Sequence, residues 1–252
     1  MNLVRALSAT MLVLAAACSM APRTEPLTIA AAASLAPVLD ELGGMYEDET
    51  GDPVVFSYGS TGNLAQQIRN GAPFDIFASA DALRVEELIS EGILTEESRI
   101  GFARGVLVLV GAPELELSLE SVEDLADPIV RDVAIANPQH APYGMAAAQS
   151  LLRSGVELVV LPKLVYGESV RHAGLLVQTG NTDAGLIALS IAKNMELSGR
   201  ELPQDLYDPI QHVAAIHRDT ALPEQAAAFL DFLSSPEAQA VYERLGLATE
   251  EG

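Results

Sequence analysis

The feature that most constrains the fold is a repeated unit of short apolar strand, small-residue turn and amphipathic helix. The first unit spans residues 27–42, where an apolar run containing β-branched Ile29 passes through alanines to Ser34. From there the apolar residues recur with a helical spacing, at Leu35, Val38, Leu39, Leu42, Met45 and Tyr46. We therefore predict a strand, a tight turn and a helix, with Ser34 as the helix N-cap and Pro37 in the first turn.

Similar units follow along the rest of the chain. The further strands that we predict are residues 54–57, 74–78, 106–110, 133–136, 183–189 and 210–216, and helices lie between most of them. This alternation predicts an α/β fold with mixed, mostly parallel sheets and helices on both faces. In such folds ligands bind at the carboxyl ends of the strands, where the helix N-termini point.

Four strand-to-helix junctions share small, hydroxyl or backbone-donor character and carry no Lys or Arg. They are centred on Ser34, Thr61, Tyr143 and Val170, with Ser60 as a second hydroxyl beside Thr61. Taken singly, the junctions at Ser34 and Thr61 are better explained as turns with helix caps. Together the four junctions predict a site that holds a small, fully ionised oxyanion through neutral donors. A protonated oxyanion is disfavoured, because its proton would be a buried donor without an acceptor, at a cost of ~1–3 kcal/mol.

Charge limits the partners of the chain. Its 252 residues include 35 Asp and Glu against 14 Lys and Arg, a formal net charge of −21. Nucleic acid and anionic membrane surfaces are poor partners for such a chain, so we expect no nucleic-acid partner. An anion would have to be held by short-range aligned dipoles, because long-range attraction is absent.

The first residues are typical of a secretion signal. Residues 1–5 carry one positive charge, residues 6–17 are apolar, and small residues lead to Cys18, the only cysteine. This run is too short to span a membrane, so we predict that residues 1–23 are a signal peptide and that the protein works outside the cytoplasm. The setting of Cys18 resembles a lipoprotein signal and predicts lipidation there. Cleavage after Ala17 or Ala21 is the alternative, which leaves a soluble periplasmic protein.

Candidate catalytic groups are few. Asp75 and Asp81 could form a carboxylate pair, but we expect Asp81 to cap a helix and Asp75 to accept hydrogen bonds at a strand end. His140 belongs to no spacing typical of a metal site. The alternative from another class is a secreted hydrolase with Ser34 or Ser60 as nucleophile and a histidine as base. The chain has no G-x-S-x-G elbow, so we expect no enzyme activity.

Six motifs, in order, make the chain resemble the periplasmic molybdate-binding proteins of ABC transporters. They are AAASL at 31–35, YGSTGNLAQQI at 58–68, GAPFDIFASAD at 71–81, NPQHAPYG at 137–144, ESVRHAG at 168–174 and TDAGLIALS at 182–190. The resemblance implies the type II periplasmic binding protein fold, in which two α/β lobes close on a ligand cleft. We place the first lobe at residues 24–104 and 216–252, and the second at residues 105–215.

The resemblance also implies the ligand contacts. Ser34 matches a serine that donates through its hydroxyl and its backbone N–H, and Thr61 matches a second hydroxyl donor. Tyr143 and Val170 match positions that donate their backbone N–H groups. Ala188 departs from the family, because some members have a tyrosine there whose hydroxyl contacts the anion. Either the Tyr143 hydroxyl replaces that contact, or this chain makes one contact fewer.

The function implied by the resemblance is the capture of molybdate, and of tungstate, for delivery to the permease of an ABC transporter. The molybdenum would be held as its oxyanion through the residues above, without direct protein ligands to the metal. The alternative within this class is a binding protein for sulfate or another oxyanion, since rejection of the smaller sulfate would rest on cavity size. We expect a monomer that carries no cofactor.

Overall fold

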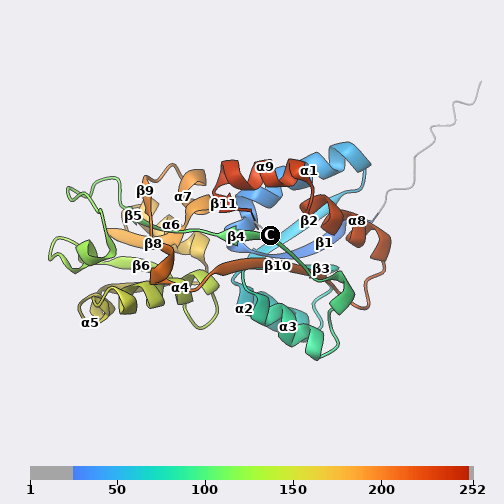
Figure 1. Cartoon of the computed structure of the whole chain (residues 1–252), viewed down its shortest axis with the longest axis horizontal. Coiled ribbons are helices and arrows are strands. Elements are labelled where there is room, and N and C mark those ends of the chain that lie inside the picture. The colour runs from blue at the N-terminus through green and yellow to red at the C-terminus, as the bar shows by residue number, and fades with distance from the viewer. Residues whose placement is uncertain (1–24, 250–252) are drawn as a thin grey trace, which may run out of the picture.

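Two mixed β-sheets organise the computed structural model, which describes residues 25–249. Figure 1 shows the sheets side by side along the long axis, each with its own helices, so the molecule is divided into two lobes. The predicted signal peptide and Cys18 lie outside the described residues. Among residues 25–249, no helix is both long and apolar enough to cross a membrane.

The sheet of the first lobe has six strands in the order β11-β4-β10-β3-β1-β2. They are β1 (Leu27–Ala32), β2 (Val54–Gly59), β3 (Ile76–Ser79), β4 (Ile100–Gly105), β10 (Ile210–Ile216) and β11 (Leu247–Ala248). β1 pairs in parallel with β2 and β3, whereas β10 and β11 pair antiparallel with their neighbours. The carboxyl ends of β1, β2 and β3 therefore meet at one edge of the sheet.

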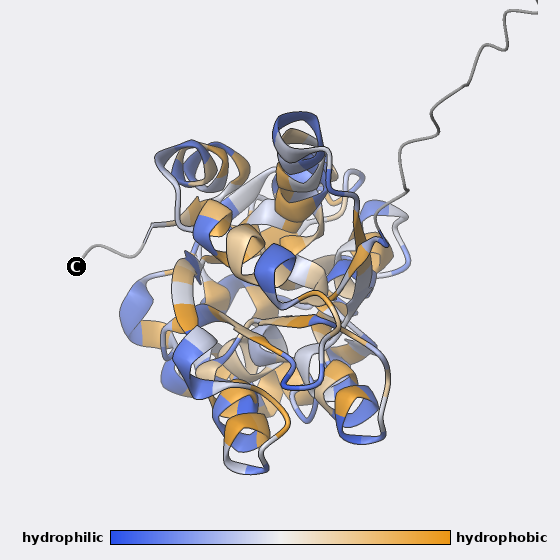
Figure 2. Cartoon of the chain, turned by 90° about the vertical axis from the view of Figure 1, so that its right-hand side faces the viewer, coloured by the Kyte–Doolittle hydropathy of each residue, from blue (hydrophilic) through white to orange (hydrophobic). Residues whose placement is uncertain are grey.

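Five helices cover this sheet. They are α1 (Ala36–Thr50), α2 (Thr61–Arg69), α3 (Ala82–Ser90), α8 (Pro223–Leu233) and α9 (Pro236–Leu245). In Figure 1, α1 and α9 lie on one side of the strands, and α2 and α3 lie on the other. Figure 2 shows hydrophobic and hydrophilic residues alternating around these helices, and in α1 the buried set includes Val38, Leu39 and Leu42. The helical spacing of the apolar residues thus predicted the buried face correctly.

The sheet of the second lobe has five strands in the order β7-β6-β8-β5-β9. They are β5 (Leu107–Gly111), β6 (Val133–Ala136), β7 (Leu164–Gly167), β8 (Ala184–Ala188) and β9 (Gly199–Glu201). Its helices are α4 (Pro142–Arg153), α5 (Glu157–Val160), α6 (Val170–Gln178) and α7 (Leu189–Asn194). β6 is parallel to β7 and β8, but β5 is antiparallel to β8 and β9. The sheets are mixed as predicted but not mostly parallel, because strands next to the crossings run in the opposite direction.

The chain crosses from one sheet to the other in two adjacent segments. β4 leads through Val106 into β5, and the chain returns through a 3₁₀ turn, η5 (Gln204–Leu206), to β10. The segments are tied together, since the N–H of Leu107 donates to the Tyr207 hydroxyl at 3.2 Å. β10 pairs with β3 and β4 along its length, so the lobe limit suggested between residues 215 and 216 falls inside this strand.

The two candidate carboxylates have structural roles, as expected. Asp81 caps α3 by accepting from the N–H of Arg84 at 2.8 Å. Asp75 accepts from both the N–H and the hydroxyl of Thr28, each at 2.8 Å. These bonds hold the ends of β1 and β3 together and leave no carboxylate pair for catalysis.

The prediction that Ser34 caps the first helix is wrong. Ser34 lies in a 3₁₀ turn, η1 (Ala33–Leu35), and α1 begins after it with Leu35 as its N-cap. Neither cap position of these two helical segments has a side-chain hydrogen bond. The physical reason is that the Ser34 hydroxyl contacts His212 of β10 instead of the start of α1. Pro37 does lie in the first turn of α1, as predicted.

Candidate functional site

A small cavity lies between the lobes, at the junctions that the sequence singled out. It is lined by residues 32–34, 59–61, 80, 141–143 and 170. It leaves only about 10 Å³ for the centre of a water-sized molecule. At this size the cavity has room for about one water-sized group in this structure, so sugars, peptides and nucleotides do not fit.

The structure brings together all but one of the predicted site residues. Ser34, Ser60 and Thr61 line the cavity from the first lobe, and Tyr143 and Val170 line it from the second. Ala188 does not line it. It is fully buried at the end of β8, where it is the N-cap residue of α7.

Ser34 is fixed by groups from two other segments. Its Oγ lies 3.2 Å from Nε2 of His212, in the crossing strand β10. Its carbonyl accepts a hydrogen bond from the hydroxyl of Ser190, on α7 of the second lobe, at 2.7 Å. Sequence reasoning missed both partners, although His212 is a lone ionisable residue in an otherwise apolar half-strand. These two contacts fix the position of the Ser34 hydroxyl and of its backbone.

Two hydroxyl groups follow β2. The Thr61 Oγ1 accepts from the N–H of Ala80 at 3.2 Å, which leaves its own hydrogen to donate elsewhere. The Ser60 hydroxyl is buried and has no hydrogen-bond partner among the described residues. An unpaired buried hydroxyl beside a cavity is a donor that a ligand oxygen can satisfy.

Backbone donors complete the second-lobe side. α4 begins at Pro142 and α6 begins at Val170, so the N–H groups of Tyr143 and Val170 belong to first turns and have no acceptor within their helices. Ser169 caps α6 by accepting from the N–H of His172 at 3.2 Å, and within residues 25–249 the Val170 N–H makes no hydrogen bond. The helix dipoles add positive potential at both ends, and neither end carries a positive side chain into the cavity.

The Tyr143 side chain passes out of the second lobe and packs against the crossing strands. A Cβ at Gly105 would lie 2.2 Å from the Tyr143 hydroxyl oxygen, so the hydroxyl occupies the space that the glycine leaves open. Its ring centroid is 6.3 Å from that of His212. Burial raises the pKa of the Tyr143 hydroxyl, which is therefore neutral, and the nearby Ser34 hydroxyl opposes this shift without forming a hydrogen bond of normal geometry with it.

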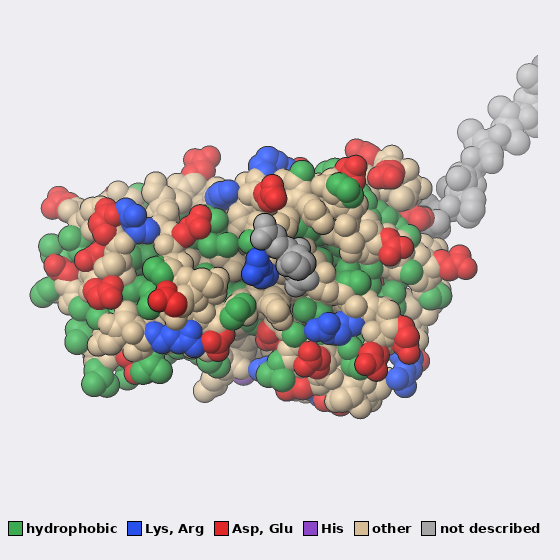
Figure 3. All heavy atoms as spheres, viewed as in Figure 1, with side chains coloured by type: hydrophobic (Ala, Val, Ile, Leu, Met, Phe, Trp, Pro, Cys, Tyr) green, Lys and Arg blue, Asp and Glu red, His purple; other side chains and the backbone are tan. Residues whose placement is uncertain are grey.

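The electrostatics of the cavity come from neutral groups alone. None of the residues that line it is charged. Acidic side chains are instead spread over the surface, as Figure 3 shows for one face. Burial lowers the pKa of His212 to about 3, so its ring is neutral at physiological pH. His140 is exposed, and no cluster of metal-ligating side chains occurs within residues 25–249.

The lobes also touch directly beside the cavity. The N–H of Gly62, in the first turn of α2, donates to the carbonyl of His140 in the second lobe at 2.8 Å. A Cβ at Gly62 would lie 3.0 Å from both the Cα and the carbonyl oxygen of His140. Glycine is therefore the residue that lets the two backbones approach this closely.

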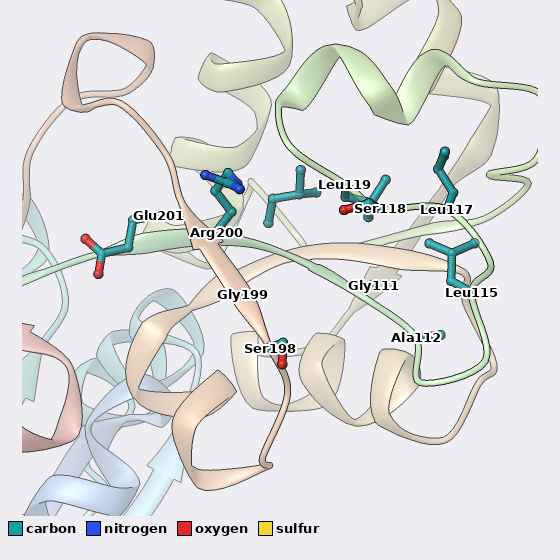
Figure 4. A pocket seen from close by; sticks show the side chains of 11 residues that line it. Gly111, Ala112, Leu115, Leu117, Ser118, Leu119, Ser198, Gly199, Arg200 and Glu201 are labelled. Atoms are coloured by element: carbon teal, nitrogen blue, oxygen red, sulfur yellow. The ribbon is translucent and has the colours of Figure 1, made fainter.

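A larger hollow lies elsewhere, on the second lobe. Figure 4 shows it between β9 and the loop after β5, with the side chains of Leu115, Leu117 and Leu119 and of Arg200 around it. It leaves about 600 Å³ for the centre of a water-sized molecule and is open to solvent. Because none of the predicted site residues lines it, the small cavity between the lobes is the candidate site.

Two α/β lobes, joined by paired crossings and closed over a small cavity of neutral donors, define a solute-binding protein. The chain belongs to the family of bacterial extracellular solute-binding proteins, which it matches over residues 27–248. It is 36% identical to the molybdate-binding protein ModA of Rhodobacter capsulatus over 227 residues, which cover 88% of this chain and 87% of the relative. The resemblance inferred from the six motifs is thereby confirmed.

Solved structures agree with this assignment. The periplasmic molybdate-binding protein of Azotobacter vinelandii superposes with a TM-score of 0.82 at 33% identity, covering 89% of this chain and 100% of that chain. The sulfate-binding protein SubI of Mycobacterium tuberculosis superposes with a TM-score of 0.77 at 17% identity, covering 90% and 87%, a likeness that shows the fold alone. The predicted two-lobe periplasmic binding protein fold is confirmed.

Proposed function

We propose that this protein captures molybdate outside the cytoplasm and delivers it to the membrane permease of an ABC transporter, with tungstate as a second ligand. The observation that carries the proposal is the cavity itself, where hydroxyl and N–H donors from both lobes converge without one charged side chain. The family, and relatives that bear the name molybdate-binding protein, support the same ligand. We further expect a monomer, and attachment to the membrane through Cys18.

Each predicted contact has a defined donor in this scheme. The hydroxyls of Ser34 and Thr61 bind the anion from the first lobe, together with the N–H of Ser34. The N–H groups of Tyr143 and Val170 bind it from the second lobe, and the Ser60 hydroxyl is a further donor within the same cavity. Molybdenum is then held only through its oxygens, with no side chain bound to the metal.

Selectivity follows from the donor set and from closure. All these groups donate and none of the lining side chains is a carboxylate, so an oxyanion that keeps a proton is disfavoured. The contacts of Gly62 with His140 and of Ser190 with Ser34 set how closely the lobes approach. A smaller anion such as sulfate would leave some donors out of reach, which is the basis of its expected rejection.

One observation favours a hydrolase, because the structure does place a histidine beside Ser34. The pair nevertheless lacks what nucleophilic catalysis needs. The low pKa of His212 makes it a poor base, its Nδ1 has no carboxylate partner among the described residues, and its side chain is fully buried. We therefore expect no turnover of chromogenic esters by the purified protein.

Calorimetric titration of the purified protein with molybdate, tungstate, sulfate and phosphate at neutral pH tests the proposal. We expect tight one-to-one binding of molybdate and tungstate and no heat from phosphate. Equal affinity for sulfate and molybdate would reduce the function to general oxyanion binding. Absence of heat with all four anions would refute it.

A further inference from the structure

His212 is a buried polar residue that the ligand scheme does not use. It lies in β10 at an irregularity in the pairing with β4, where the register shifts between His212 and Val213. Such bulges redirect a side chain relative to its strand. The relative exposure of His212 is 0%, and its ring centroid lies 6.0 Å from that of Phe102. We expect a fully buried imidazole to make hydrogen bonds, because burying a polar ring without them is costly.

We propose that His212 is a positioning residue whose Nε2–H donates to the Ser34 Oγ, so that the serine keeps its own hydrogen free for the ligand oxyanion. The inference rests on the proposed function, since it concerns the donor state of a proposed ligand contact. It assigns His212 no contact with the anion. The residue acts through Ser34 alone.

The tautomer follows from the partners of the two ring nitrogens. A neutral imidazole carries one hydrogen, on either Nε2 or Nδ1. Nε2 has the Ser34 Oγ at 3.2 Å, whereas Nδ1 has no partner of normal geometry among the described residues. The Ala103 carbonyl, across the β4–β10 ladder, is the competing acceptor for an Nδ1 hydrogen. A hydrogen on Nε2 has the Ser34 Oγ as its acceptor at 3.2 Å, whereas a hydrogen on Nδ1 would meet the Ala103 carbonyl without the geometry of a normal hydrogen bond, so the contacts favour the Nε2–H tautomer.

The opposite tautomer would work against the site. With the hydrogen on Nδ1, the Ser34 hydroxyl would have to donate to Nε2, and its oxygen lone pairs would face the cavity. A bound oxyanion would then meet an acceptor where it needs a donor. A bound oxyanion therefore stabilises the Nε2–H tautomer of His212, and this tautomer in turn raises the affinity for the oxyanion.

Two substitutions of His212 test separately the loss of its hydrogen-bond donor and the loss of its ring shape. His212→Phe keeps a buried ring but removes the donor, and we expect it to weaken molybdate binding about tenfold, the effect of one hydrogen bond. His212→Gln offers an amide N–H near the Nε2 position and should retain affinity within about threefold. In a Ser34→Ala background, His212→Phe should change affinity by less than about twofold, because the two residues act as one unit. Calorimetry with sodium molybdate provides each value.

The ring tautomer of wild-type protein is measured independently by ¹⁵N NMR of the imidazole nitrogens, with and without molybdate. We expect a protonated Nε2 and a bare Nδ1 in the molybdate complex. A protonated Nδ1 in that complex, equal affinity of His212→Phe and wild type, or additive effects with Ser34→Ala would each overturn the inference. These outcomes are distinct from failure of the proposed function, in which wild-type protein would not bind molybdate at all.

Discussion

The two halves of the cavity are built differently. On the first-lobe side the donors include side-chain hydroxyls, and Ser34 and Thr61 are each held by a specific partner, His212 and the N–H of Ala80. On the second-lobe side the proposed donors are backbone N–H groups at the starts of α4 and α6, which exist whatever side chains those positions carry. The first half should therefore be sensitive to side-chain substitution and to pH, and the second only to changes in the backbone.

The largest effect that we expect concerns pH and the first half. The pKa of His212 is lowered to about 3 by burial, against about 6.5 in an unfolded chain, so below pH 6.5 the unfolded state binds the extra proton. Stability is thus highest above pH 6.5 and falls as the pH is lowered toward 3. Between pH 7 and 4.5 this one group costs about 2.5 kcal/mol of stability. Thermal unfolding across this range measures it.

The matched control for this prediction is His212→Gln, which cannot titrate. The variant should lose most of the pH dependence between pH 6.5 and 4.5. Hydrogen bonds from backbone N–H groups and from Arg131 lower the pKa of Asp183. This carboxylate makes stability depend on pH only at lower pH values, where it becomes protonated. Identical profiles for variant and wild type would show that His212 is not the group responsible.

The second half is tested by Val170→Pro, which removes one N–H and little else. Proline is accepted at the first position of a helix, and Ser169 before it has φ −144° and ψ 169°, which suits a residue preceding proline. Loss of a hydrogen bond to a charged ligand should weaken molybdate binding by about 1.5–3 kcal/mol, roughly 10- to 160-fold. Val170→Ala keeps the N–H and should bind within about twofold of wild type. Equal loss in both variants would mean that the side chain matters and the backbone does not.

In the first half, Thr61→Val removes a hydroxyl at nearly constant shape. We expect about a tenfold loss of molybdate affinity, together with a lower melting temperature because the Ala80 N–H loses its acceptor. Thr61→Ser should preserve both. If Ser60→Ala weakened binding and Thr61→Val did not, the adjacent hydroxyl would be the ligand contact. Calorimetry and thermal unfolding of the three variants decide between the two hydroxyls.

The boundary between the halves is tested at Gly62. Gly62→Ala places a Cβ 3.0 Å from the backbone of His140, so it should oppose lobe closure by about 1 kcal/mol and weaken binding about fivefold. Gly44→Ala is the control, since a Cβ there meets no atom within 4 Å and should slightly stabilise α1. Unchanged affinity in Gly62→Ala would show that the lobes close without this contact.

Much of this arrangement was predictable from the sequence because local patterns carry it. The apolar period of α1, the capping Asp81 and the starts of α4 and α6 depend on neighbouring residues, and the structure places them close to where the sequence did. The convergence of the junctions on one cavity followed from a general rule of α/β sheets, in which strand ends meet at one edge.

The errors share a different cause, since each depends on contacts distant in sequence. Ser34 is not an N-cap because its hydroxyl contacts a residue 178 positions later, and neither that contact nor the bond from Ser190 has a local signature. β10 was predicted with correct limits, but its pairing with β3 and β4, which places it wholly in the first sheet, is a property of the assembled fold. One clue in the sequence was not used. His212 is the only ionisable residue of β10, and it precedes the apolar half of that strand.

The smallest expected effect concerns Tyr143, which belongs to both halves. Its N–H is a proposed donor of the second half, and its ring packs against crossing strands of the first. Its hydroxyl fills the space above Gly105, so we expect Tyr143→Phe to change molybdate affinity by less than about twofold. Removing a buried hydroxyl without a partner should also raise the melting temperature of the unliganded protein slightly. A tenfold loss of affinity would instead mean that the hydroxyl turns to the anion and replaces the tyrosine contact that the family resemblance implies at the position of Ala188. The donor set would then no longer divide into hydroxyls on one lobe and backbone on the other.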